Sequence, residues 1–197
     1  MGLNMKKLDL YVQHKSEYVT PKSPVLIDVS PAQYLAISGS GKPGGTVFQK
    51  KLGALYNVAF TIKMTMKFAG QDYAVAKLEG LWGDRPKQAA DWSWTLIIRT
   101  PDFIGAKELK EAVRKLLDKG KDPEVGEVEI KKLKEGRSVQ MLHTGPYDQE
   151  SASIEKMREF AAGQGLAFRG LHHEIYLSDP RRVAPEKLRT ILRHPVA

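Results

Sequence analysis

The stretch TVFQKKLGALYNVAFTIKMTM (residues 46–66) decides the fold of the first half of the chain. Its apolar side chains recur at alternating spacings of four and three residues, at Phe48, Leu52, Leu55, Ala59, Ile62 and Met66. This period places them on one face of a helix of roughly five turns, so we expect a helix that packs against a core. Tyr56 and Phe60 lie beside this stripe and are expected to widen it. Thr46 and Gln49 form a capping-box pattern at its start.

Strands are expected on both sides of this helix. The sequence QYLAISGS (33–40) alternates and runs into a glycine-rich turn, after an irregular lead-in over residues 1–30. Two further strands are expected at 73–82 and 93–100, joined by a polar loop at 83–91. The same order then begins again with a strand, a helix and two more strands, at 136–143, 148–163, 171–178 and 188–193.

Two successive strand–helix–strand–strand (SHS2) modules predict an α+β fold. We expect a single domain over residues 1–197, with a first module at about 30–100 and a second at about 136–197. Between them lies a linker region, 101–135, which contains an amphipathic helix. One module has a single sheet, so two must associate to enclose a ligand-sized groove between them.

The composition excludes several classes of protein. The chain has 197 residues, 42% of them hydrophobic, and no cysteine, which excludes disulfides, thiolate nucleophiles and Cys-ligated metals. No apolar run approaches the ~20 residues needed to span a bilayer, and the start of the chain lacks the apolar core of a signal peptide. We therefore expect a cytoplasmic protein with no membrane partner.

The net charge of +8 is unevenly spread along the chain. No acidic residue lies between Asp28 and Asp72, a stretch that contains five lysines. A nucleic-acid binder would be expected to interleave its basic residues with aromatic ones or to carry a reading-helix motif, and the sequence has neither pattern. We expect the charge to serve solubility and no specific nucleic acid to bind. Weak affinity for an anionic partner is the alternative.

The string HHEIY (172–176) carries the first candidate site. In a strand, His172, Glu174 and Tyr176 point to one face, and the residues between them point to the other. A carboxylate between an imidazole and a phenol is partly desolvated, which suits a general base or a recessed anion that holds a cationic ligand. The alternative is an ordinary hydrogen-bonded strand glutamate. Glu79, in the string KLEGLW, occupies the corresponding place in the first module.

Aromatic residues near these strands are candidates to bind a ligand. Trp82 ends its strand beside a glycine and could form the wall of a pocket, whereas Trp94, inside a strand, is expected to pack in the core. Tyr147 follows Pro146 at a helix start and could reach a ligand near Glu174. The candidate catalytic residues are Glu174 and Tyr147, and the candidate substrate-binding residues are Trp82, Glu79, Tyr176, His143, His172 and Tyr56.

No metal or cofactor is expected from the motifs. His172 and His173 are adjacent on a strand, so they face opposite sides and cannot bind one ion together, and no HExxH string is present. His143 is expected to be a hydrogen-bonded strand histidine, and Asp148 a helix N-cap. The sequence also lacks a phosphate loop and a GxSxG elbow.

Three strings carry a resemblance to a known family: KLEGLWGD (77–84), HTGPYDQESASI (143–154) and GLHHEIYLSDPRRVAPEKLRTILRHPV (170–196). They resemble the GyrI-like small-molecule-binding family, and more narrowly its stand-alone branch without a DNA-binding domain. The resemblance implies two SHS2 modules in a pseudo-twofold arrangement around a ligand groove. Related modules form effector domains of multidrug-responsive transcription activators, where a glutamate in the groove meets lipophilic cations, and Glu174 matches that position.

The resemblance also implies a function. Part of the stand-alone branch is known as cyclopropanoid hydrolases, which add water to the strained ring of DNA-alkylating natural products. In that role Glu174 would orient or deprotonate water, Tyr147 or Tyr176 would donate to the carbonyl that accepts charge, and aromatic residues such as Trp82 would stack on the flat substrate. The alternatives are a non-catalytic protein that sequesters lipophilic compounds or regulates a partner, and a gyrase-interacting protein.

Overall fold

The computed structural model describes residues 7–83 and 92–197, so the loop expected at 83–91 lies almost wholly outside the described residues. The fold is α+β, and the described strands pair in antiparallel fashion. The structure divides into two compact units, which we describe separately. The first contains residues 7–13, 32–76 and 92–133, and the second contains residues 14–31, 77–83 and 134–197.

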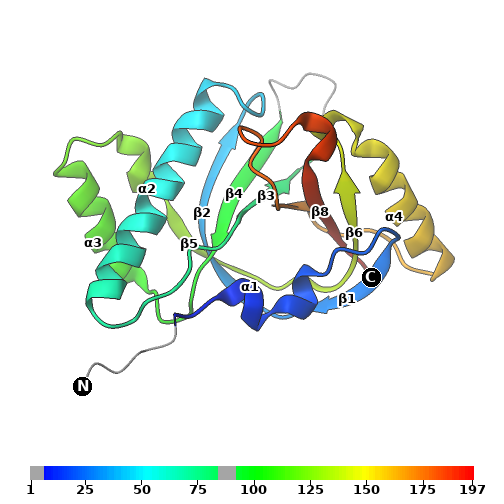
Figure 1. Ribbon diagram of the computed structural model, residues 1–197, viewed down its shortest axis with the longest axis horizontal. Coiled ribbons are helices and arrows are strands. Elements are labelled where there is room, and N and C mark those ends of the chain that lie inside the picture. The colour runs from blue at the N-terminus through cyan, green and yellow to red at the C-terminus, as the bar shows by residue number, and fades with distance from the viewer. Residues whose placement is uncertain (1–6, 84–91) are drawn as a thin grey trace. The chain divides into compact units, whose positions relative to one another are not determined.

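The first unit is a three-stranded sheet with two long helices, α2 and α3, which lie side by side (Figure 1). Its strands lie in the order β4-β2-β5, with Ile37 opposite Leu96 and Leu35 opposite Ile130. The elements are α1 (Leu10–Gln13), β2 (Ala32–Ser40), α2 (Thr46–Phe68), β4 (Ser93–Arg99), α3 (Ala106–Leu117), the 3₁₀ helix η3 (Pro123–Glu127) and β5 (Glu129–Leu133).

Helix α2 packs on β2 through one buried face, as its sequence period predicts. The buried side chains are Ala54, Leu55, Val58, Ala59, Ile62 and Met66. Phe60 does not widen this face, because it is 52% exposed on the other side of the helix. The expected capping box is also wrong: Thr46 is already helical, and the cap is Gly45, which has no side chain to contribute.

The second unit is a five-stranded antiparallel sheet in the order β1-β6-β8-β7-β3, with α4 on β6 (Figure 1). Met157 and Ala161 of the helix pack against Val139, Met141 and Leu192 of the sheet. The elements are η1 (Lys15–Tyr18), β1 (Val25–Val29), β3 (Leu78–Trp82), β6 (Gly136–Thr144), η4 (Tyr147–Gln149), α4 (Ser151–Gly163), β7 (His172–Tyr176), η5 (Pro185–Lys187) and β8 (Arg189–Pro195).

The order strand–helix–strand–strand occurs twice, as β2-α2-β3-β4 and as β6-α4-β7-β8, which confirms the expected order. Two edge strands were not expected. β1 lies in the predicted irregular lead-in and pairs with β6, and β5 lies in the predicted linker region and pairs with β2. Both are short, and β5 (EIKKL) is mostly charged, as edge strands often are, so its sequence lacks the alternation of a half-buried strand.

No helix in the described ranges, 7–83 and 92–197, is both long and apolar enough to cross a membrane.

Candidate functional site

Strand β7 presents the candidate acid on one face together with its predicted neighbours. The Tyr176 hydroxyl donates to Glu174 Oε2 at 2.8 Å, and His172 Nε2 lies 3.4 Å from Glu174 Oε1. Glu174 is only 3% exposed. The alternation expected for HHEIY is therefore confirmed, and the glutamate is a buried carboxylate between an imidazole and a phenol.

Strand β3 adds Trp82 to the same face. In the antiparallel pairing with β7, Trp82 lies opposite His172 and Gly80 lies opposite Glu174. Trp82 Nε1 donates to the Tyr176 hydroxyl at 3.2 Å. A Cβ on Gly80 would lie 2.8 Å from the Tyr176 hydroxyl, so glycine here makes room for the phenol that holds the acid.

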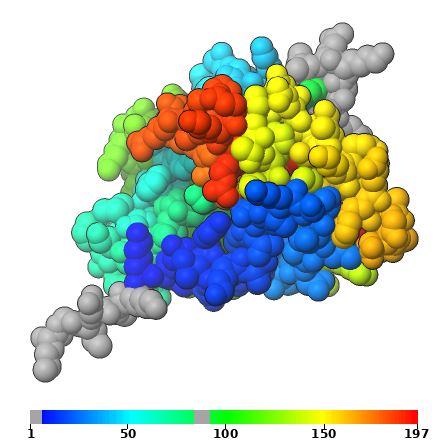
Figure 2. All heavy atoms as spheres, turned by 45° about the vertical axis from the view of Figure 1, so that its right-hand side comes forward, coloured from blue at the N-terminus to red at the C-terminus, as the bar shows by residue number. Residues whose placement is uncertain are grey.

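The turn before α4 brings Tyr147 to this group. Gly145 N donates to Leu188 O at 2.9 Å, so the turn lies beside the segment before β8, where the yellow and orange-red surfaces adjoin in Figure 2. The ring of Tyr147 meets that of Tyr176 edge-on, with centroids 5.8 Å apart. Burial and the charges of Glu150 and Glu174 raise the pKa of Tyr147 to about 12. The phenol therefore stays protonated at neutral pH and can donate a hydrogen bond.

Glu150 is a member of this group that the sequence analysis missed. It occupies the N-cap position of α4 without a side-chain capping hydrogen bond, is 1% exposed, and offers a carboxylate oxygen within 4.8 Å of ligand atoms of His172 and Glu174. Asp148, which was expected to be the N-cap, lies in η4 instead. The only signal for Glu150 in the sequence was its place in HTGPYDQESASI, because an acid near a helix start is usually explained by capping alone.

His172 is 9% exposed and borders a second histidine. Its ring centroid lies 5.8 Å from that of His194, which stacks on Phe168 at 4.0 Å. Burial lowers the pKa of His194 to about 4 and outweighs its hydrogen bond to Pro195 O, so His194 is neutral at pH 7. Within residues 7–83 and 92–197, neither ring nitrogen of His172 has a hydrogen-bond partner.

The opposite face of β7 carries a separate buried network centred on His173. Its Nε2 lies 2.8 Å from Glu79 Oε2, and its Nδ1 lies 2.9 Å from Glu135 Oε1. Tyr18 donates to the other oxygen of Glu79 at 3.3 Å. Glu79, a predicted substrate-binding residue, thus lies opposite Ile175 on this face and is held within the protein interior rather than beside Glu174.

Arg193 completes this network. Its Nη1 donates to Glu135 Oε2 at 2.9 Å, and its Nε donates to Gln140 at 2.8 Å. Burial lowers the pKa of His173, but the charges of Glu135 and Glu79 outweigh it and raise the pKa to about 9. Burial likewise raises the pKa of Glu135, and His173 and Arg193 outweigh it and lower the pKa to about 2. The network therefore holds alternating charges at neutral pH.

His143 is fully engaged inside the second unit. Its Nδ1 lies 3.0 Å from Ser153 Oγ, and its Nε2 donates to Pro146 O at 3.2 Å. It is therefore a hydrogen-bonded strand histidine, as expected, and it joins the turn before α4 to the helix. Both of its ring nitrogens are used within the protein, so it positions the turn that carries Tyr147 and does not itself join Glu174.

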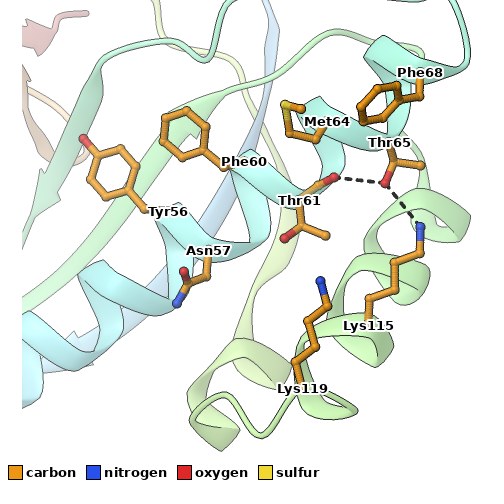
Figure 3. Close-up of a pocket in the computed structure, with 9 residues that line it drawn as sticks. All are labelled: Tyr56, Asn57, Phe60, Thr61, Met64, Thr65, Phe68, Lys115 and Lys119. Carbon is orange, nitrogen blue, oxygen red and sulfur yellow. Dashed lines mark hydrogen bonds between the residues drawn. The ribbon is translucent and has the colours of Figure 1, made fainter.

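Tyr56 belongs to the first unit, where it lines a pocket of about 610 Å³ between α2 and α3 (Figure 3). The aromatic and apolar side chains of α2 form one side, and Lys115 of α3 and Lys119, just after α3, lie on the other. Lys115 donates to Thr65 Oγ1 at 3.3 Å. The lining includes no carboxylate, so this pocket offers hydrophobic contact and positive charge but no acid–base pair.

The second unit thus groups a buried carboxylate, Glu174, with the phenols of Tyr147 and Tyr176 and the indole of Trp82. The fold, with its repeated strand–helix–strand–strand order, is that of an α+β small-molecule-binding domain. The chain belongs to the GyrI-like family, the GyrI-like small molecule binding domain, which matches residues 22–197.

Solved structures support this assignment. A protein from Listeria innocua encoded by lin2189 and described as a hydrolase is 36% identical, with a TM-score of 0.89 over 98% of this chain and 100% of that one. An uncharacterized conserved protein from Listeria innocua is also 36% identical, with a TM-score of 0.91 over 97% and 100%. The C-terminal domain of EcmrR, at 11% identity and a TM-score of 0.61 over 89% and 97%, shares the fold. No curated protein sequence matches the chain significantly.

Proposed function

We propose that the chain binds flat, lipophilic aromatic compounds beside Glu174 and hydrolyses the cyclopropane ring of cyclopropanoid alkylating agents. The observation that carries the proposal is the burial of Glu174 on a face shared with Tyr176, Trp82 and Tyr147. A carboxylate that water solvates poorly is a stronger base than an exposed one. The Listeria innocua relative described as a hydrolase, at 36% identity, supports a hydrolytic reaction.

The proposed reaction adds water across a strained carbon–carbon bond. Glu174 takes a proton from water as the water oxygen bonds to the methylene carbon of the ring. The ring bond breaks, and its electron pair moves through the conjugated system to the carbonyl oxygen, which becomes a phenolate. That phenolate then gains a proton, so water is consumed and no other reactant is needed.

The two phenols have different roles in this proposal. Tyr176 donates a hydrogen bond to Glu174 and accepts one from Trp82, so it positions the base. Tyr147 is the phenol that donates a hydrogen bond to the substrate, because its pKa of about 12 keeps it protonated. A donor aimed at a developing oxyanion stabilises the charge that forms as the ring opens.

The test is turnover of a cyclopropane-bearing alkylator, followed by loss of the dienone chromophore and by mass spectrometry of the ring-opened product. Glu174→Gln should lower the rate by about 10²–10⁴-fold, the usual contribution of a general base. Tyr147→Phe should lower it by about 10²-fold or more, as for loss of an oxyanion donor. Glu129→Gln, at an exposed strand position in the first unit, is the matched control for the acid, and Tyr11→Phe for the phenol.

Turnover that neither Glu174→Gln nor Tyr147→Phe affects would exclude this catalytic assignment. Stoichiometric binding of the alkylator without ring opening would favour a sequestering protein instead. Ligand binding is measured separately by the quenching of tryptophan fluorescence, so that the two outcomes are distinguished.

A further inference from the structure

Two adjacent histidines of β7 have opposite surroundings. His173 is bound on both ring nitrogens by carboxylates, in a network whose charges alternate. His172 is nine-tenths buried, yet within residues 7–83 and 92–197 neither of its nitrogens has a hydrogen-bond partner. A buried imidazole normally finds partners for its nitrogens, so this arrangement suits a ligand that the nitrogens would bind.

The atoms around His172 are spaced as metal ligands are. His172 Nε2 lies 3.4 Å from Glu174 Oε1, a distance at which no hydrogen bond forms here. Two ligands about 2.1 Å from a tetrahedral Zn²⁺ lie about 3.4 Å apart. Glu150 brings a third ligand atom within 4.8 Å of the other two. A side-chain rotation of Glu150 that brings this atom to about 3.4 Å from the other two would complete three ligand positions.

The surroundings also resemble those of a metal site. The Tyr176 hydroxyl donates to Glu174 Oε2, which orients Oε1 toward His172, and Trp82 in turn holds that hydroxyl. Carboxylates that bind metals are commonly oriented by such hydrogen bonds. Glu150 and Glu174 are both almost completely buried, and a divalent cation would neutralise two carboxylate charges that repel each other in the same site.

We propose that Glu150, His172 and Glu174 form a three-ligand site for a divalent transition-metal ion such as Zn²⁺. Two carboxylate oxygens and one imidazole nitrogen are ligands that such ions accept, and three protein ligands leave a fourth position for water or substrate. His172 and His173 lie on opposite faces of β7, as expected, so they cannot share one ion. The third ligand, Glu150, comes from another element of the fold, which local sequence spacing does not reveal.

The test measures metal binding directly, on the full-length untagged chain stripped with a chelator. Zn²⁺ is titrated against a competing chromophoric chelator, and Co²⁺ is added to record its visible ligand-field absorption. We expect one equivalent of each ion per chain. Glu150→Gln and His172→Gln should each weaken Zn²⁺ binding by about 100-fold or more, and Tyr176→Phe, which loses only a supporting hydrogen bond, by about 10-fold.

The matched control is His14→Gln. His14 lies 3.6 Å from Glu17, which makes a second His–Glu pair in the same unit with a more exposed histidine. Zn²⁺ binding that His14→Gln abolishes, or that Glu150→Gln and His172→Gln leave unchanged, would overturn the proposal. Thermal unfolding in chelator shows whether each variant is folded, and the graded loss in Tyr176→Phe keeps the test decisive where a ligand variant does not fold.

Metal binding is measured without substrate, so its result does not depend on turnover. A bound ion would occupy Glu174 Oε1 while Tyr176 donates to Oε2, so Glu174 can act as the base only in the metal-free chain. A chain that binds Co²⁺ through these residues but opens no cyclopropane ring supports the metal site and refutes the proposed reaction. A chain that opens the ring after complete metal removal, and binds no Zn²⁺, refutes the metal site and supports Glu174 as the base.

Discussion

His173 carries a positive charge between two buried carboxylates, and this charge makes the stability of the second unit depend on pH. Glu79 and Glu135 lie 2.8 and 2.9 Å from its two nitrogens. Replacing His173 with glutamine keeps a side chain that can form hydrogen bonds but removes the charge. Raising the pH removes the same charge from the wild type without a mutation.

The magnitude follows from the pKa of His173, which is about 9 in the folded chain and 6.5 in an unperturbed histidine. One pKa unit corresponds to about 1.4 kcal/mol, so this charge contributes about 3 kcal/mol to the free energy of unfolding. Because the folded pKa is the higher one, the contribution is complete below pH 6.5 and is lost as the pH rises through 9. The lowered pKa values of Glu135 and His194 affect stability only below pH 6.5, so they do not overlap this range. The raised pKa values of Tyr73, Tyr147 and Tyr176 lower stability as the pH approaches 10, but they do so equally in the wild type and in His173→Gln, so the difference between the two isolates His173.

The assay is urea unfolding at closely spaced pH values from about 6 to about 10, followed by circular dichroism. The wild type should lose about 3 kcal/mol across this range. His173→Gln should be less stable than the wild type by about 3–5 kcal/mol at pH 6.5, because the carboxylates lose their shared cation. Its stability should then change little up to about pH 9, and the fall toward pH 10 that the buried tyrosines cause should be the same as in the wild type.

The matched control is His143→Gln, which removes another buried, hydrogen-bonded histidine from the same unit. This variant should keep the dependence of the wild type on pH above 6.5. If the wild type is equally stable at pH 6.5 and pH 10, or if His173→Gln shows the same loss as the wild type, His173 is not charged in the folded chain and the reasoning is refuted.

Three further predictions concern the site and its surroundings. In Gly80→Ala the new Cβ would lie 2.8 Å from the Tyr176 hydroxyl, so stability should fall by about 1–3 kcal/mol and ligand binding should weaken. Gly53→Ala, with nothing within 4 Å of the new Cβ, should instead gain about 0.5–1 kcal/mol, and thermal unfolding with ligand titration distinguishes the two. The ultraviolet difference between wild type and Tyr147→Phe should titrate near pH 12, and a midpoint at 10 would contradict the burial of this phenol. The folded pKa of Glu135 is about 2, below its ordinary 4.5, so its contribution to stability is present above pH 4.5 and lost as the pH falls toward 2; the loss between about pH 6 and about pH 3 should be smaller in Glu135→Gln.

Local periodicity predicted the parts of the fold that bury a continuous apolar face. The spacing of Leu55, Ala59 and Ile62 predicted α2, and the structure buries those side chains. The alternation of HHEIY predicted that Glu174 and Tyr176 share a face, and a hydrogen bond joins them. Both patterns depend only on the geometry of a single helix or strand.

The edge strands could not be predicted in the same way. β1 and β5 pair through backbone hydrogen bonds with β6 and β2, which lie far away in the sequence. β5 (EIKKL) is mostly charged and lacks the alternation of a half-buried strand, and β1 (VLIDV) is a short apolar run beside prolines, so in both cases the strand depends on partners that are far away in the chain.

The difference between Glu79 and Glu174 also required the tertiary structure. The sequence places both in similar strings, yet the register of β3 on β7 puts Glu79 opposite Ile175 and Gly80 opposite Glu174. A shift of one residue moves a side chain to the other face of the sheet. Glu79 thus joins His173 in an internal network, and Glu174 lies beside Tyr176 and His172.

The sequence by itself determined the α+β class, the repeated order of elements, the family, and one face of β7 with its acid. Only the tertiary structure decided that Glu150 joins that acid, that Glu79 does not, and which histidine of the adjacent pair is bound on both nitrogens. The reason is physical: helix and strand periods are local properties of the chain. The charge, burial and partners of an ionisable side chain are set by elements far away in the sequence that pack around it.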